Sequence, residues 1–355
     1  MAYTTIDDPS AHFQTQLYTG NAGVNNITNG GNSNLQPDWV WLKSRDLSQP
    51  HTLRDSTRGT NKFLYITNTD EGTNTYLTSF NSDGFSMNAT DNEVNGNSNT
   101  YVAWQWKANG GTRTTFTESS NNPGGGRQVN TTAGFSIIDY VGTGGNGTIA
   151  HGLGAVPNLV IVKARDTGTN DSWFTHWTGL LADAARIIYW NNQDGQANNA
   201  TAFNSTAPTS TNVTVGTNSG TNTDAKNYIM YAITNIQGYS KVGSYEGNGS
   251  ASSGAFVYTG FKPKWLYVRR FDSGDNSQMV DIERDPVNEM DAFLIADTNG
   301  AENTHANNIH VDFLSNGFKM YEDNGIVNAD GGDYVYWAYA DNPFVSSKGV
   351  PTTAR

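Results

Sequence analysis

The chain has 355 residues, no cysteine, 15% charged residues and a formal net charge of −12. Without cysteine it can form no disulfide, thiolate metal site or cysteine nucleophile, and its acidic balance argues against nucleic acid, which attracts clustered lysine and arginine. No stretch approaches the ~20 apolar residues of a membrane span, and residues 1–8 lack the features of a secretory signal. Glycine (38) and asparagine (43) are abundant, yet 12% of the residues are aromatic, which predicts a packed core.

The chain contains one pattern three times. Each copy opens with an aromatic, glycine-containing strand, at residues 13–20, 135–142 and 239–247. A landmark strand follows, in which a proline precedes four apolar residues and a basic one, at residues 37–43, 157–163 and 263–269. A third apolar run lies at residues 62–66, 186–190 and 292–296, and an alternating aromatic strand closes each copy at residues 101–106, 228–233 and 334–339. Agreement in order and spacing at four places predicts three tandem domains.

The spacing of short apolar runs between Gly, Asn, Asp and Ser clusters is typical of an all-β sandwich or barrel. We therefore predict three tandem β-sandwich or jelly-roll (lectin-like) repeats. We place the first at residues 1–111, the second at 134–237 and the third at 238–345, with a Gly/Asn/Thr-rich linker at 112–133 and a C-terminal tail at 346–355. The short junction near residue 236 predicts that repeats two and three pack as a pair, with repeat one more independent. Helix formers are dense only at residues 179–186, enough for one or two turns.

The landmark strands are apolar on both faces. One parity is apolar in every copy, at Val40, Leu42, Val160, Val162, Leu266 and Val268, which assigns it to the core. The opposite parity carries Trp39, Trp41, Leu159, Ile161, Trp265 and Tyr267. A strand buried on both faces needs a cover, and we expect a neighbouring repeat or another subunit to supply it.

Loops rich in oxygen ligands follow the third apolar run, at residues 68–74, 191–196 and 297–303. Calcium takes six to eight oxygen ligands, but none of these loops has the regular acidic spacing of an EF-hand. Asparagine and aspartate beside glycine are also what tight turns require. We favour turns over calcium sites.

Candidate catalytic residues do not form a recognisable set. The six histidines are His12, His51, His151, His176, His305 and His310, and no two of them lie at metal-ligand spacing on a predicted helix. Asp281, Glu283 and Asp285 could supply the paired carboxylates of a glycosidase, but the other copies carry no counterparts. Serine-hydrolase and phosphate-loop signatures are absent. We predict no catalytic site, no metal and no cofactor, and leave the ligand-binding residues open.

The chain resembles the tandem-repeat virion proteins of tailed bacteriophages, especially marine cyanophages and pelagiphages. The segments that carry the resemblance are residues 3–10, 17–21, 101–108, 151–157, 243–250, 314–318 and 340–344.

The resemblance implies a non-enzymatic virion structural protein, assembled in the cytoplasm of the bacterial host. We expect a tail-fibre-like exterior appendage that contributes to host-surface attachment. Its expected partners are other virion proteins, further copies of the chain (a trimer is one option) and a host-surface glycan. The alternatives are a capsid decoration protein without receptor binding, and a carbohydrate-binding module or polysaccharide depolymerase.

Overall fold

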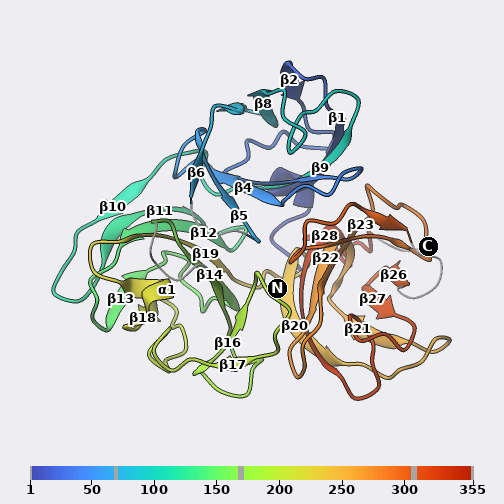
Figure 1. The fold of residues 1–355 in the computed structure, drawn as a ribbon. Coiled ribbons are helices and arrows are strands. Elements are labelled where there is room, and N and C mark those ends of the chain that lie inside the picture. The colour runs from blue at the N-terminus through green and yellow to red at the C-terminus, as the bar shows by residue number, and fades with distance from the viewer. Residues whose placement is uncertain (1, 68–70, 167–171, 305–309, 353–355) are drawn as a thin grey trace.

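The computed structural model describes residues 2–67, 71–166, 172–304 and 310–352, and it is nearly all β. Its strands fall into three units, each a large antiparallel sheet packed on a small one. Figure 1 shows the units as three lobes around a common centre. The all-β sandwich class expected from the sequence is thus confirmed, and the strands of each sequence copy fall into one unit.

The sheet orders correspond between the units. In unit 1 the large sheet is β1 (Phe13–Thr19), β9 (Thr100–Trp106), β3 (Trp39–Ser44), β4 (Thr52–Asp55), β5 (Lys62–Tyr65) and β6 (Gly72–Thr73), and the small sheet is β2 (Val24–Ile27), β8 (Phe85–Asn88) and β7 (Leu77–Phe80). In unit 2 the same large-sheet order is β12 (Phe135–Val141), β19 (Asn227–Ile233), β14 (Leu159–Ala164), β15 (Trp173–Trp177), β16 (Arg186–Tyr189) and β17 (Ala197–Asn198), and the small sheet is β13 (Gly147–Ala150) and β18 (Asn212–Val215). In unit 3 the large sheet is β20 (Ser240–Glu246), β28 (Asp333–Pro343), β22 (Phe261–Arg270), β23 (Ser277–Asp281), β24 (Ala292–Ile295) and β25 (Asn303–Thr304), and the small sheet is β21 (Ala255–Tyr258), β27 (Gly317–Met320) and β26 (Val311–Leu314).

Side-chain contacts repeat with the strands. A tyrosine of the opening strand stacks on a tyrosine of the closing strand at 5.0 Å in every unit, in the pairs Tyr18–Tyr101, Tyr140–Tyr228 and Tyr245–Tyr334. Each unit also has a fully buried asparagine whose side-chain amide donates to a backbone carbonyl; these residues are Asn95, Asn222 and Asn328. These shared contacts establish which positions of the three units are equivalent.

The two faces of each large sheet enter different cores. The parity that contains Val40 and Leu42 packs on the small sheet of its own unit, and so do its equivalents in units 2 and 3. The parity that contains Trp39 and Trp41 enters one central cluster to which all three units contribute. The assignment of both parities to buried positions was therefore correct.

The central cluster is a stack of aromatic rings from all three units. Trp39 lies 4.4 Å from Tyr231 of unit 2 and 6.2 Å from Trp337 of unit 3, measured between ring centroids. Trp106 packs against Trp265 of unit 3 at 5.8 Å. Neighbouring units within the chain thus supply the cover for the landmark strands, and these faces do not call for another subunit.

Three sequence-based expectations about the connections were wrong. Residues 112–133 are no simple linker, because they contain β10 (Thr114–Phe116) and β11 (Gly124–Asn130), which extend the large sheet of unit 2 beside β12. Unit 1 is not independent, because it packs on both other units through the central cluster. Residues 179–185 form turns and bends and Arg186 begins β16; the helices within the described residues are η1 (Pro9–Ala11) and α1 (Ser219–Asn222).

The N-terminal residues are bound to unit 3 and to the junction that precedes it. The Tyr3 hydroxyl donates to the Gly260 carbonyl at 2.7 Å, the Thr4 hydroxyl donates to the Gln237 carbonyl at 2.8 Å, and Ile6 enters the central cluster. This segment therefore fastens the beginning of the chain to its last unit. Within the described residues, no helix has the length and apolar character needed to cross a membrane.

Candidate functional site

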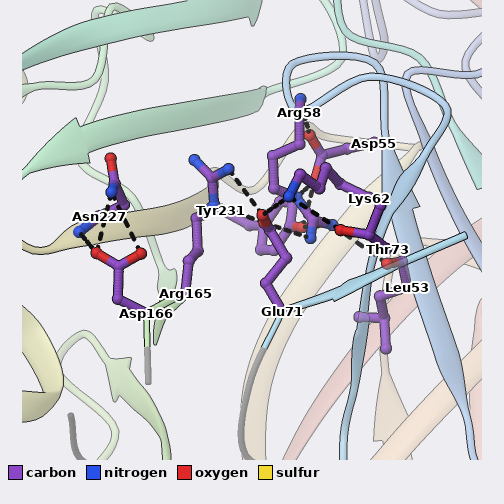
Figure 2. Close-up of polar contacts among 10 residues, drawn as sticks. All are labelled: Leu53, Asp55, Arg58, Lys62, Glu71, Thr73, Arg165, Asp166, Asn227 and Tyr231. Atoms are coloured by element: carbon purple, nitrogen blue, oxygen red, sulfur yellow. Dashed lines mark hydrogen bonds and ion pairs between the residues drawn. The ribbon is translucent and has the colours of Figure 1, made fainter. Parts of the chain in front are cut away.

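A buried chain of charges joins units 1 and 2 (Figure 2). Asp55, at the end of β4, accepts a 2.6 Å bond from Arg58, which we call the inner arginine. Arg58 lies 3.3 Å from Glu71, and Glu71 accepts two bonds of 2.6 and 3.0 Å from Arg165 of unit 2, the outer arginine. The Tyr231 hydroxyl of unit 2 donates to Asp55 at 2.8 Å. Two carboxylates and two guanidinium groups thus alternate across the boundary.

The electrostatics of this chain favour the charged forms. Burial lowers the pKa of Arg58, but the charges of Asp55 and Glu71 and the contact with Tyr231 outweigh it and raise this pKa. Burial raises the pKa of Glu71, but the bond from Arg165 and the nearby guanidinium charges leave it below its usual value. Burial, followed by the charge of Asp55, raises the pKa of Tyr231 well above its usual value. Arg58 and Glu71 are therefore held in their charged forms, whereas Tyr231 stays neutral and donates its hydroxyl hydrogen to Asp55.

An equivalent network of charged side chains joins units 3 and 1. Asp281 pairs with the inner arginine Arg284 at 2.6 Å, and Arg284 lies 3.2 Å from Glu302. The outer arginine, Arg45 of unit 1, donates three hydrogen bonds to Glu302, the shortest 2.6 Å long. Trp104 takes the place of the tyrosine and donates to Asp281 at 3.0 Å.

The boundary between units 2 and 3 has the same backbone contact without the charges. An equivalent backbone N–H to carbonyl bond crosses each boundary, from Glu71 to Arg165, from Glu302 to Arg45 and from Gln196 to Phe271. Gln196 therefore occupies the position that the glutamate holds at the other two boundaries, and Phe271 occupies the position of the outer arginine. Counting three residues from the end of β15 places Leu180 at the inner arginine.

A hollow lies at this third boundary. Its volume is about 430 Å³, and Leu180, Gln196 and Phe271 are among the residues that line it. Trp177 ends β15 at the position that Asp55 and Asp281 hold at the ends of β4 and β23. Trp337 lies at the position of Tyr231 and Trp104, which donate hydrogen bonds to those two aspartates. Within the described part of the chain, the Trp337 Nε1–H has no acceptor.

Two of the oxygen-rich loops accept hydrogen bonds from a neighbouring unit through their backbone carbonyls. The buried Lys43, at the basic end of a landmark strand, donates to the carbonyl of Asn299 in the unit 3 loop at 3.4 Å. Arg269 donates to the carbonyl of Asp194 in the unit 2 loop at 2.6 Å. Residues 68–70 of the first loop lie outside the described residues. No group of three or more metal-ligating side chains occurs in the part of the chain that the structure describes.

The described histidines lie apart from one another and have structural partners. His51 is buried and links units 1 and 3, because its Nδ1 accepts from Trp41 at 2.9 Å and its Nε2 lies 3.0 Å from the Ile295 carbonyl. The buried His151 lies 3.1 Å from the Thr209 carbonyl, and His12 packs on Tyr239. His310 faces two glutamates on the surface of unit 3, and His305 lies outside the described residues.

His176 gives a testable pH dependence. It is buried in the unit 2 sandwich edge-on to Phe203, and burial lowers its pKa from 6.5 to about 4. Below pH 6.5 the unfolded chain therefore binds a proton that the folded chain does not, so stability is lost as pH falls. We expect the slope of unfolding free energy against pH to fall by up to ~1.4 kcal/mol per unit in His176→Gln between pH 6.5 and 4. Urea titrations of both proteins measure it; equal slopes would contradict the assignment.

The three carboxylates considered for glycoside hydrolysis have separate structural roles. Asp281 belongs to the buried charge network between units 3 and 1, and Asp55 is its counterpart in unit 1, so the expectation that it has no counterpart was wrong. Glu283 pairs with Lys264 at 2.6 Å, and Asp285 accepts a 2.7 Å bond from the backbone N–H of Asp291. These contacts do not favour a shared catalytic site.

The exposed aromatic side chains gather on one small sheet. All nine tryptophans are buried, whereas Phe256 and Tyr258 on β21 are 51% and 50% exposed. Lys319 lies directly opposite Phe256 in the sheet, and Lys241 Nζ lies 5.7 Å from the Tyr258 ring centroid. Leu314 of the same sheet lines a groove of about 890 Å³. This face of unit 3 can therefore offer ring surfaces beside polar groups.

Sequence reasoning missed both the charged chains and this aromatic face. The chains could have been found from the shared spacing of Asp55 with Arg58 and of Asp281 with Arg284, three residues apart in both copies. The aromatic face carried a weaker signal, because the alternation in residues 255–258 does not tell which parity is covered.

The comparisons with known proteins place the chain in one family. Residues 8–343 match a family profile described as a domain of unknown function (DUF7483), so the chain belongs to that family. The match spans all three units. No curated protein matches the chain.

Proposed function

We propose that this member of the DUF7483 family is a structural protein on the exterior of a tailed-phage particle, where it contributes to host-surface attachment. The observation that carries the proposal is the shared aromatic core, which closes three sandwich units into one body. Such a body suits an exposed part that must keep its shape without disulfides. The resemblance of its sequence segments to virion proteins supports the same role.

The proposed partners are other virion proteins. The apolar landmark faces no longer argue for a homo-oligomer, because the chain buries them itself. The first twelve residues are not a free anchor either, since Tyr3, Thr4 and Ile6 are engaged on unit 3 or in the central cluster. We therefore place the contact with the particle on the surfaces of the units.

Imaging of purified phage particles with gold-labelled antibody against the chain tests the proposal. We expect label on an exterior appendage at the tail. Label confined to the capsid would favour the decoration alternative, and particles without label would overturn the proposal.

A carbohydrate-binding role is the second candidate, and the exposed pair Phe256 and Tyr258 favours it. Aromatic faces beside hydrogen-bonding groups are suited to packing against the apolar face of a sugar ring. The equivalent positions of units 1 and 2 carry smaller side chains, at Asn26, Thr28, Thr148 and Ala150. The aromatic pair is therefore specific to unit 3.

Exchange of this pair for the residues of unit 1 tests sugar binding. In Phe256→Asn/Tyr258→Thr we expect affinity for host-surface polysaccharide to fall about tenfold or more, the effect of losing about 1.4 kcal/mol. Thermal stability should change little because both side chains are half exposed. Val24→Ser, an exposed change on the small sheet of unit 1, is the matched control. Absence of saturable binding by the unmodified chain would exclude this candidate.

A further inference from the structure

The hollow between units 2 and 3 occupies the place of the charged chain at the other two boundaries. At those boundaries the glutamate and the outer arginine are joined directly by hydrogen bonds. Here Gln196 and Phe271 hold those positions, and they leave a cavity of about 430 Å³. This is within the usual size of a small ligand site.

Two carboxylates stand on the rim of this hollow. Glu246 on β20 and Asp333 on β28 both line it, both are exposed, and they lie directly opposite each other in the sheet. Like charges in directly opposed positions are destabilising. Among the described residues neither side chain has an ion-pair partner.

The pair is also confined to unit 3. The equivalent pair in unit 1 is Thr19 and Thr100, and in unit 2 it is Val141 and Asn227. Neither pair carries a charge. An acidic pair without an ion-pair partner among the described residues therefore occurs at the boundary where Leu180 and Phe271 replace the inner and outer arginines.

We propose that this hollow receives an arginine side chain from a separate partner protein. The alkyl stem would pack on Leu180 and Phe271, and the guanidinium would reach Glu246 and Asp333 on the rim. Arginine suits both surfaces, because its planar group stacks on aromatic rings and binds carboxylates with two hydrogen bonds. The incoming arginine would give this boundary a guanidinium–carboxylate contact, as Arg165 and Arg45 do at the other two.

Charge argues for a separate partner and against a second copy. The chain carries a formal charge of −12, so two copies repel each other, whereas a basic segment is attracted. That the partner is a virion protein rests on the proposed function; the arginine site itself does not.

A peptide titration of the full chain tests the site. The probe is a pentapeptide with one central arginine between glycines, compared with the same peptide carrying citrulline, which keeps the shape and removes the charge. We expect saturable binding of the arginine peptide by NMR, at least tenfold weaker binding of the citrulline peptide, and at least a tenfold loss in Glu246→Gln/Asp333→Asn. Both changed side chains are exposed and their mutual repulsion is removed, so the melting temperature of the variant should be no lower than that of the parent chain.

The control is Glu118→Gln/Asp224→Asn, which removes the same charge from two exposed positions elsewhere and should bind as the parent does. Equal binding of both peptides, no saturation, or equal losses in the two double variants would overturn the proposal. A dimer of the chain that dissociates in Glu246→Gln/Asp333→Asn would identify a second copy as the occupant and would also overturn it. Antibody labelling of particles is a separate measurement, so failure of the virion role leaves this result intact.

Discussion

Glu71→Gln is expected to lower the free energy of unfolding by about 3–5 kcal/mol, the usual cost of removing one partner from a buried ion pair. The glutamate accepts bonds from Arg58 and Arg165, and both guanidinium groups would stay buried or half-buried without it. Glutamine keeps the shape and removes the charge, so the loss reports the charge. Urea unfolding followed by tryptophan fluorescence measures it.

Two further variants make this result specific. Glu302→Gln removes the equivalent charge between units 3 and 1 and should cost a similar amount. Glu118→Gln removes an exposed carboxylate and should change stability by no more than about 0.5 kcal/mol. If Glu71→Gln were as mild as Glu118→Gln, the charged chain would not hold the units together.

The pattern within one sequence copy is enough to predict strands and their parity. Alternation placed Val102, Trp104 and Trp106 on one face of the closing strand, and that face is buried in the central cluster. The same pattern cannot say what covers an apolar face, because a neighbouring unit and another subunit bury it equally well. The closure of three units around one core therefore needed the structure.

The mistaken linker has a physical cause. Residues 124–126 are three glycines, and glycine runs without apolar residues are typical of flexible linkers. In β11 they lie within a sheet, where a Cβ at Gly125 would collide with the carbonyl oxygen of Asp139. Gln128 of this strand is buried and donates to Ser56 and Thr57 of unit 1. Here glycine permits close approach, which composition alone does not distinguish from flexibility.

The charged chains could be predicted only in part. Asp55 and Arg58 are close in sequence, so their pairing is a local feature. Their partners Glu71 and Arg165 are separated by 94 residues, and only the packing of two units brings them together. The boundary between units 2 and 3 lacks this network because Leu180, Gln196 and Phe271 occupy the positions of its charged residues. Only the structure shows that these three positions face one another.

Trp39→Ala is expected to be the most damaging substitution in the central cluster. The indole is fully buried against Trp106 at 4.5 Å and against Tyr231 at 4.4 Å, so its removal leaves a large cavity. Replacing a buried tryptophan by alanine costs about 3–5 kcal/mol. Because the cavity opens among all three units, we expect one shared unfolding transition at lower denaturant concentration, with no unit left folded.

Val40→Ala is the matched control, since the neighbouring Val40 is also fully buried but faces the sandwich core of unit 1. We expect it to cost less, because fewer atoms are removed. Hydrogen exchange of the backbone amides separates the two cases. In Trp39→Ala, the protection of backbone amides should decrease in the landmark strands β3, β14 and β22 together. A decrease confined to unit 1 would mean that the three units do not share one cooperative core.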